Sequence, residues 1–257
     1  MSEETCNYFT LEGNEKPLPL KTIKTGQEMN FSDWKITEKH KGSLFISDGI
    51  LDDDLWQKSQ LKVLFLMKEA YESSSEVKED WALNDYLNKP LSVLGKPMWW
   101  TMAQWLDGLD HLVRNGTVKP FNENYKQDDK LDVLFQSCAI INIKKSAGKS
   151  SSNNEDLTSY VESDWTLIWQ QIKRVNPDII ICGHTFPLIE NKLKQQGLTK
   201  EGEWLYLSEG FYFVDFWHPS NQWPYKIKYY SLLTALEQSK AQWQTKTSDS
   251  LLVTSSQ

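Results

Sequence analysis

The sequence predicts a three-layer α/β/α fold around a central, mostly parallel sheet of four strands. Two observations predict it: four short apolar runs rich in β-branched and aromatic residues, and intervening segments whose apolar residues recur at helical spacing. Strands covered on both faces have such continuous apolar runs, and their alternation with helices is typical of βαβ units. We expect this domain over 61–245, an N-terminal extension over 1–60 and a C-terminal tail over 246–257.

Each predicted strand is centred on a run of large apolar side chains. The four strands, in order, are 62–68 (KVLFLMK), 135–145 (which contains CAIINI), 177–183 (PDIIICG) and 210–218 (GFYFVDFWH). Because these runs are continuous, we expect helices to cover both sides of the sheet.

Three segments have apolar residues at helical spacing. One stripe of the segment 99–113 contains Trp99, Met102, Leu106, Leu109 and Val113. The segment 164–175 has the same pattern and stops before Pro177, as a helix should. A terminal helix is predicted over 229–244, and the polar segment 146–156 is predicted to be a loop.

Composition excludes membrane and secreted proteins. The formal net charge is −7, and 39% of the residues are hydrophobic, as in ordinary globular proteins. The longest apolar runs, 63–67 and 138–141, are far shorter than the ~18–20 residues of a membrane helix, and no secretion signal opens the chain. We expect a cytoplasmic monomer with no membrane partner.

Cysteines and histidines give no sign of a metal or cofactor. The three cysteines, Cys6, Cys138 and Cys182, are far apart and form neither a disulfide framework nor a four-cysteine cluster. No two histidines have metal-ligand spacing. We therefore expect no metal and no cofactor.

Polar residues follow each predicted strand, where ligands bind in parallel sheets. They are Lys68, Glu69 and Tyr71 after the first strand, Asn142 at the end of the second, Gly183 and His184 after the third, and His218, Pro219 and Ser220 after the fourth. Each has an ordinary structural explanation, since Glu69 could cap a helix and Asn142 could satisfy a turn. Their convergence at one edge of the sheet favours a functional site.

This ordered set resembles the motifs of the uracil-DNA glycosylase superfamily. That family has Gly-Gln-Asp-Pro-Tyr after its first strand, an Asn ending its second and His-Pro-Ser after its last. Here the first motif is similar to MKEAY (67–71), the second to INIKK (141–145) and the third to HPSNQW (218–223). Met67-Lys68 replaces Gly-Gln and Ala70 replaces the proline. The resemblance implies a divergent member with a uracil-DNA glycosylase-like fold.

The activity that the resemblance implies is that of a monofunctional DNA glycosylase, which hydrolyses the N-glycosidic bond of a flipped-out base and leaves an abasic site. Glu69 would stabilise the sugar cation or orient a water, and His218 would donate a hydrogen bond to the departing base. Asn142, Tyr71 and Lys68 would form the base pocket. The substrate stays open between uracil, another damaged base in DNA repair, and a hypermodified cytosine of phage DNA in antiviral defence.

Other residues near the motifs are expected to contact duplex or single-stranded DNA. Lysines follow the second and fourth strands in segments without acidic residues, which offsets the negative net charge locally. Trp223 or Trp217 would act as a wedge that fills the gap left by the flipped-out base. The predicted DNA contacts are Lys144, Lys145, Lys149, Ser220, Trp223, Lys226 and Lys228.

Two other functions remain open. Gly148-Lys149-Ser150 matches the end of a phosphate-binding P-loop, but the glycine required five residues earlier is replaced by Ile143, inside a predicted strand. A nucleotide-binding protein is therefore the weaker alternative. The other alternative is a DNA-binding module that has the same fold without catalysis, because fold alone does not establish function.

Overall fold

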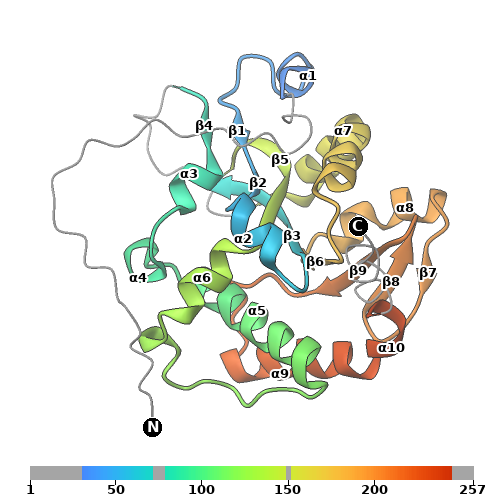
Figure 1. Ribbon diagram of the computed structural model, residues 1–257. Helices are drawn as coiled ribbons and strands as arrows, with labels where there is room; N and C mark the ends of the chain where they lie inside the picture. The colour runs from blue at the N-terminus through green and yellow to red at the C-terminus, as the bar shows by residue number, and fades with distance from the viewer. Residues whose placement is uncertain (1–30, 72–78, 149–151, 245–257) are drawn as a thin grey trace, which may run out of the picture. The chain divides into compact units, whose positions relative to one another are not determined.

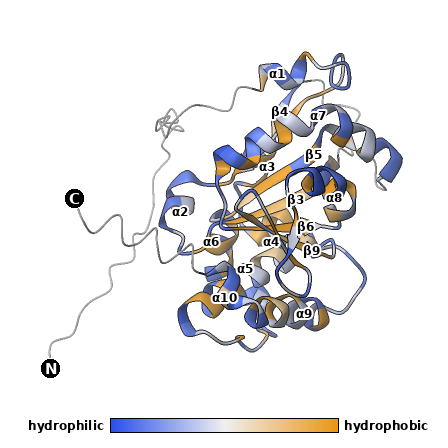
Figure 2. Ribbon diagram, turned by 90° about the vertical axis from the view of Figure 1, so that its right-hand side faces the viewer, coloured by the Kyte–Doolittle hydropathy of each residue, from blue (hydrophilic) through white to orange (hydrophobic). Residues whose placement is uncertain are grey.

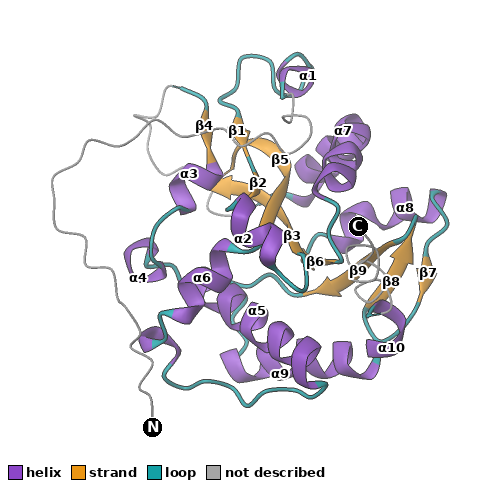
Figure 3. Cartoon of the chain, in the orientation of Figure 1, coloured by secondary structure: helices purple, strands orange, loops and turns teal. Residues whose placement is uncertain are grey.

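The structure, a computed structural model, describes residues 31–71, 79–148 and 152–244. Its larger sheet has seven strands in the order β2-β5-β3-β6-β9-β8-β7 (Figures 1 and 3). In that order the strands are Gly49–Ile50, Ala139–Gly148, Val63–Tyr71, Ile179–Gly183, Phe211–Phe216, Leu205–Ser208 and Thr199–Lys200. A second, parallel sheet pairs β1 (Ile46–Ser47) with β4 (Trp81–Ala82).

The four central strands of the larger sheet, β5, β3, β6 and β9, are parallel and correspond to the four predicted strands. The prediction of a central, mostly parallel sheet is confirmed, whereas the predicted number of strands is wrong because the sheet has seven. The other three strands pair antiparallel at the edges. β2 and β7 have two residues each and β8 has four, which is too short for a recognisable apolar run.

Helices connect these strands. They are α1 (Ser32–Lys35), α2 (Asp53–Lys58), α3 (Leu83–Leu87), α4 (Leu91–Leu94), α5 (Pro97–Asn115), a 3-10 turn (Tyr125–Gln127), α6 (Lys130–Gln136), α7 (Asn154–Val175), α8 (Phe186–Gln195), α9 (Tyr225–Gln238) and α10 (Lys240–Trp243). The predicted helices over 99–113 and 164–175 lie within α5 and α7, and the terminal helix is divided at Ser239. None of the helices in the described ranges is long and apolar enough to cross a membrane.

Side chains of the central strands alternate between two apolar cores. Phe65 and Met67 of β3 lie in one core, and Leu64 and Leu66 lie in the other. The first core also contains buried residues of α5, α6 and α9, and the second contains those of α7 and α8. Helices therefore pack on both faces of the sheet, and Figure 2 shows the apolar strands enclosed between them.

The predicted loop over 146–156 is wrong at both ends. β5 continues to Gly148, and α7 already begins at Asn154. The early start of α7 has a local cause, because the Asn153 side chain accepts hydrogen bonds from the N–H groups of Glu155 (2.8 Å) and Asp156 (3.2 Å). The polar composition of this segment thus reflects a helix cap.

Residues 31–60 contribute to the sheet and to the core. β2 pairs with β5, and Trp34 and Trp56, each 1% exposed, lie in the same core as α7 and α8. The predicted boundary at residue 60 therefore does not coincide with a structural boundary. The remainder of the predicted extension, 1–30, and the predicted tail, 246–257, lie outside the described residues.

Candidate functional site

We call the carboxyl ends of the four central strands, β3, β5, β6 and β9, the carboxyl edge. These strands do not all end at the same level. β6 ends at Gly183 and β9 at Phe216, whereas β3 and β5 continue to Tyr71 and Gly148. β3 therefore projects beyond β6 and β9 at the edge where parallel sheets bind ligands. Tyr71, a predicted base-pocket residue, ends β3, and its side chain lies outside the described part of the chain.

Lys68, Glu69 and Asn142 lie within strands, although the sequence predicts the first two after a strand and the third at a strand end. Asn142 is paired with Met67, and Glu69 is paired with Lys144. The prediction ended the strands with their apolar runs, whereas the pairing of β3 with β5 continues beyond these runs. All three residues still belong to the two strands that project at the carboxyl edge.

Glu69 is held by an ion pair. Its Oε2 lies 3.1 Å from Nζ of Lys144, and its side chain is 5% exposed. The same ammonium lies 2.8 Å from Oδ2 of Asp156 in the first turn of α7. Burial alone would lower the pKa of Lys144, but its hydrogen bonds to Asp156 and Glu69 outweigh burial and raise it. Gly148 permits this packing, since a Cβ there would lie 2.3 Å from the Glu69 carboxyl carbon.

Lys68 links Glu69 electrostatically to His218. Burial lowers the pKa of the Lys68 ammonium, and the charge of Glu69 partly raises it again. The pKa of His218 is lowered to about 4, first by burial and then by the charges of Lys68, His184 and Lys228. His218 is therefore neutral at pH 7 and lies in a positively charged environment.

The segment after β9 fixes the imidazole of His218. Ser220 donates its N–H to Nδ1 at 3.2 Å, and Ser220 Oγ lies 2.7 Å from the same nitrogen. Because a backbone N–H can only donate, Nδ1 accepts, and the neutral ring carries its proton on Nε2. Lys228 also holds this segment, because its ammonium donates hydrogen bonds to the carbonyl oxygens of Pro219 (2.8 Å) and Asn221 (3.3 Å). His218 thus presents one tautomer.

His184 follows β6 and has a left-handed backbone with φ of 60°. Its side chain is exposed, and its N–H donates to the carbonyl oxygen of Phe216 at 2.8 Å. Left-handed non-glycine residues are uncommon and cluster at functional sites. The next residue, Thr185, does not cap α8 with its side chain, because its hydroxyl donates to the carbonyl oxygen of Leu66. His184 therefore joins His218 at the carboxyl edge.

Asn142 is 3% exposed and contacts Asp48, the residue before β2. Asp48 Oδ2 accepts hydrogen bonds from Asn142 N at 2.8 Å and from Asn142 Nδ2 at 3.2 Å. Nothing in the sequence marks Asp48, which stands as an isolated acidic residue in the segment ISDGI. The pairing of β2 with β5 brings it to the site.

The prediction that Lys145 and Lys228 contact DNA is wrong. Lys145 is 0% exposed and forms a buried ion pair, and Lys228 is 2% exposed. Ammonium groups buried this deeply cannot reach a phosphate. Lys226 is at the surface and pairs with Glu123, while Lys149 lies outside the described residues. Those of the predicted lysines that the structure describes therefore do not form a basic surface.

Two stacked indole rings follow β9. Trp217 and Trp223 have ring centroids 5.9 Å apart and an interplanar angle of 22°. Trp223 is 55% exposed, whereas Trp217 packs behind it against Phe216 and Trp204. Of the two predicted wedge candidates, Trp223 is the one at the surface.

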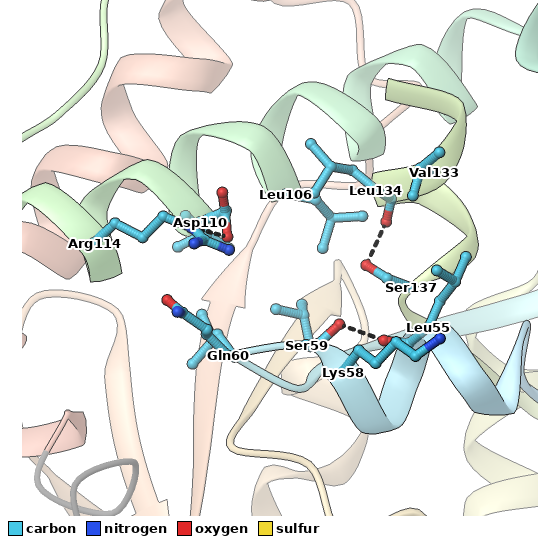
Figure 4. Close-up of a pocket in the computed structure, with 13 residues that line it drawn as sticks. Leu55, Lys58, Ser59, Gln60, Leu106, Asp110, Arg114, Val133, Leu134 and Ser137 are labelled. Carbon is cyan, nitrogen blue, oxygen red and sulfur yellow. Dashed lines mark hydrogen bonds and ion pairs between the residues drawn. The ribbon is translucent and has the colours of Figure 1, made fainter. Parts of the chain in front are cut away.

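A cavity of about 160 Å³ lies at the opposite end of β3. Figure 4 shows it between α2, α5 and α6, with Leu55 and Leu106 on its walls and the ion pair of Asp110 and Arg114 at its side. None of the predicted site residues lines this cavity. It is therefore separate from the carboxyl edge.

Within residues 31–71, 79–148 and 152–244, no group of three or more His, Cys, Asp or Glu side chains is arranged to hold a metal ion. Comparisons of the chain with protein-family models, with curated proteins and with solved structures give no significant match. Function is therefore inferred from the geometry of the carboxyl edge.

Proposed function

We propose that the chain is a monofunctional DNA glycosylase on a uracil-DNA glycosylase-like, three-layer α/β/α fold. It would hydrolyse the N-glycosidic bond of a flipped-out uracil or modified pyrimidine and leave an abasic site. One observation carries the proposal: the carboxyl edge holds both a hydrogen-bond donor, Nε2 of His218, whose Nδ1 accepts from Ser220, and a carboxylate, Glu69, fixed by Lys144. Cleavage of this bond develops negative charge on the base and positive charge on the sugar, and these groups match both charges.

His218 supplies the hydrogen bond to the departing base. Its pKa of about 4 keeps the ring neutral at pH 7, and Nε2 is the donor because Nδ1 accepts from Ser220. A donor aimed at a developing anion is often worth ~3–4 kcal/mol in the transition state. The positive charge of Lys68, which disfavours protonation of His218, also stabilises a base anion beside it.

Glu69 acts on the sugar side of the bond. A carboxylate there stabilises the sugar cation or orients a water, a contribution typically worth ~10²–10⁴-fold in rate. The ion pair with Lys144, at 3.1 Å, fixes the position of the carboxylate. Because Oε2 already contacts the Lys144 ammonium, we propose that the carboxylate acts electrostatically and does not abstract a proton.

Trp223 is the proposed wedge. Flipping a base out of a duplex costs a few kcal/mol, and an exposed ring that is backed by Trp217 can fill the gap. Stacking of a base on an aromatic ring is worth ~1–3 kcal/mol. With Lys145 and Lys228 buried, we propose that stacking contributes more to DNA affinity than these lysines do.

The alternative is a DNA-binding module without catalysis. The observation that favours it is the burial of Glu69, which is 5% exposed and already paired with Lys144. Nucleotide binding through a P-loop is disfavoured, because β5 runs as a strand from Ala139 through Ile143 to Gly148, where the loop would have to lie.

The test is release of free bases, measured by mass spectrometry. The DNA panel contains uracil, deaminated bases, and hydroxymethylated or glucosylated cytosine. Wild type is compared with Glu69→Gln, which removes the charge of Glu69 while Lys144 keeps Asp156 as a partner at 2.8 Å. The matched control is Asp156→Asn, which neutralises the other carboxylate on the same lysine.

The expected result is a base released by wild type and by Asp156→Asn but not by Glu69→Gln, with folding and DNA binding retained in all three. The DNA that yields the base would separate a repair function from a function against modified phage DNA. Full activity of Glu69→Gln would remove Glu69 from the mechanism. No base from any DNA, with binding retained, would select the module without catalysis.

A further inference from the structure

The cavity of about 160 Å³ at the amino end of β3 has mostly aliphatic walls. Leu55 of α2, Leu106 and Leu109 of α5, and Val133 of α6 contribute to them, and Figure 4 shows these helices around the cavity. An apolar cavity of about 150 Å³ can hold a molecule of the size of benzene. A leucine side chain is smaller than benzene, so the cavity has room for one.

The hydroxyl groups in the walls already donate to the backbone. Ser59 Oγ donates to the carbonyl oxygen of Leu55 at 2.9 Å, and Ser137 Oγ donates to that of Leu134 at 2.8 Å (Figure 4). Because a hydroxyl group has a single proton, neither serine is left to donate to a polar ligand. The walls therefore favour an apolar occupant.

The rim of the cavity has more basic than acidic residues. Arg114 lines it together with Asp110, and Nε of the arginine lies 2.8 Å from Oδ1 of the carboxylate. Lys58, in the last turn of α2, also lines the cavity and forms no ion pair with any residue that the structure describes. An occupant with an acidic group beside an apolar one would therefore complement the cavity in charge.

The described part of the chain ends beside this cavity. The side-chain amide of Gln244 donates to the carbonyl oxygen of Val113 at 3.3 Å, and Val113 directly precedes Arg114. The residues that follow, 245–257, lie outside the described residues, and their only apolar side chains are those of 251–253 (LLV). Three consecutive apolar residues in a polar segment need a surface that buries them.

We propose that this cavity is the docking site of the segment 249–253 (DSLLV) of the same chain. A leucine of the segment occupies the cavity, and Asp249 lies at the basic rim. The contact is independent of the proposed function, because it lies at the end of β3 opposite the carboxyl edge.

The chain is long enough for this contact. Leu251 comes seven residues after Gln244, and an extended chain of that length spans up to about 23–25 Å. The stretch of α5 from Val113 back to Leu106 measures only about 10 Å. Because both partners belong to one chain and the linker is short, the segment is present at the cavity at about millimolar effective concentration, so a weak contact suffices.

The experiment measures how fast Val133→Cys reacts with iodoacetamide in the full chain. Val133 lines the cavity and is 54% exposed, so a thiol there reports whether the segment covers it. Burial of one leucine side chain shifts an equilibrium by about tenfold or more. We therefore expect labelling to be at least about fivefold slower than in a chain that also carries Leu251→Asp and Leu252→Asp. Peptide mapping by mass spectrometry assigns the label to position 133.

Ser255→Asp combined with Ser256→Asp is the matched control, because it adds the same charges close to the segment and keeps both leucines. It should keep the slow rate of labelling. Asp249→Asn is the milder variant and should raise the rate by about twofold, as expected for an exposed ion pair.

Two further thiols control for effects elsewhere in the molecule. Ile36→Cys replaces a residue that is 75% exposed and does not line the cavity, so its rate should not change with the leucine substitutions. Cys138 is 0% exposed and should stay unlabelled in every variant that keeps its fold.

Slow labelling at every protein concentration, abolished by the leucine substitutions, would support the docking of 249–253 within one chain. Equal rates for Val133→Cys with and without these substitutions would overturn it. A slow rate that rises on dilution would assign the covering segment to a second copy and overturn the contact within one chain. Since no DNA is present, a failure to release any base would leave these outcomes unchanged.

Discussion

Ser220 donates its backbone N–H to Nδ1 of His218 across 3.2 Å, and its hydroxyl oxygen lies 2.7 Å from the same nitrogen. A proton on Nδ1 would convert this acceptor into a donor and break the backbone hydrogen bond. The turn after β9 therefore favours the neutral ring. Protonation of His218 would change the charge at the carboxyl edge and also loosen the turn that holds the ring.

We predict that stability falls as the pH is lowered from about 6.5 to 4, partly because of His218. An unfolded histidine binds its proton near pH 6.5, whereas the pKa of folded His218 is about 4. Between these values the unfolded state binds more protons, so the contribution of His218 is fully present above pH 6.5 and is lost as the pH falls towards 4. The full difference corresponds to about 3 kcal/mol at most.

Urea unfolding at about pH 7 and pH 4.5 measures this effect. His218→Gln removes the titrating group, so the difference in the free energy of unfolding between the two pH values should shrink. His111→Gln is the control, because His111 lies on α5, away from the carboxyl edge, and should leave the difference unchanged. The same pH dependence in His218→Gln as in wild type would contradict the prediction.

Lys228 is predicted to stabilise the turn after β9 and not to contact DNA. It is 2% exposed, and its ammonium donates to the carbonyl oxygens of Pro219 and Asn221. Lys228→Met leaves these oxygens without their donor, which should lower the free energy of unfolding by about 1–3 kcal/mol. Thermal unfolding measures this loss.

The salt dependence of DNA binding separates the two roles of Lys228. A lysine that neutralises a phosphate contributes about 0.9 to the slope of log K against log salt concentration on duplex DNA. We expect the slope of Lys228→Met to equal that of wild type. A slope that decreases by about one unit would place Lys228 on the DNA after all.

Trp223 is predicted to contribute more to DNA binding than Lys226. Trp223 is 55% exposed and stacked on Trp217, whereas Lys226 pairs with Glu123 at the surface. Trp223→Ala should weaken DNA binding by about tenfold, and Lys226→Gln by about twofold. Fluorescence anisotropy on labelled oligonucleotides measures both.

A wedge also implies a dependence on the form of the DNA. If Trp223 fills the gap left by a flipped-out base, Trp223→Ala should impair binding and base release more on duplex than on single-stranded DNA. Equal losses on the two forms would leave Trp223 as a stacking surface and exclude the wedge.

The central strands are predictable from sequence because a strand covered on both faces needs apolar side chains at every position. Leu64 and Leu66 face one core and Phe65 and Met67 the other, and together they form one continuous run. The edge strands give no such signal. Both residues of β7 (Thr199–Lys200) are exposed, and the strand exists because β8 offers it hydrogen bonds.

The site is less predictable because the direction of a side chain depends on tertiary contacts. Lys144 and Lys145 are adjacent in the sequence, yet one pairs with Glu69 at the carboxyl edge and the other is buried against Asp48. Successive side chains of a strand point to opposite faces of the sheet, so the two lysines lie on different faces. Composition does not show which of them faces the core. Asp48 and Asn142 are 94 residues apart, and their contact follows from the pairing of β2 with β5.

Trp34 is predicted to make residues 31–60 necessary for a stable domain. It is 1% exposed, its ring packs against His40, and the ammonium of Lys145 lies 5.1 Å from its centroid. Trp34→Ala removes this packing and leaves a cavity over Lys145, which should lower the free energy of unfolding by about 3–5 kcal/mol. Urea unfolding followed by circular dichroism measures the loss.

Ile36→Ala is the control for Trp34→Ala. Ile36 follows α1 and is 75% exposed, so its truncation should change the free energy of unfolding by no more than about 0.5 kcal/mol. If Trp34→Ala lowers the free energy of unfolding by less than about 1 kcal/mol, residues 31–60 pack on the domain without stabilising it. A large loss would make this segment part of the folding unit. Trp34 covers Lys145, Lys145 contacts Asp48, and the Asp48 carboxylate accepts a hydrogen bond from Asn142.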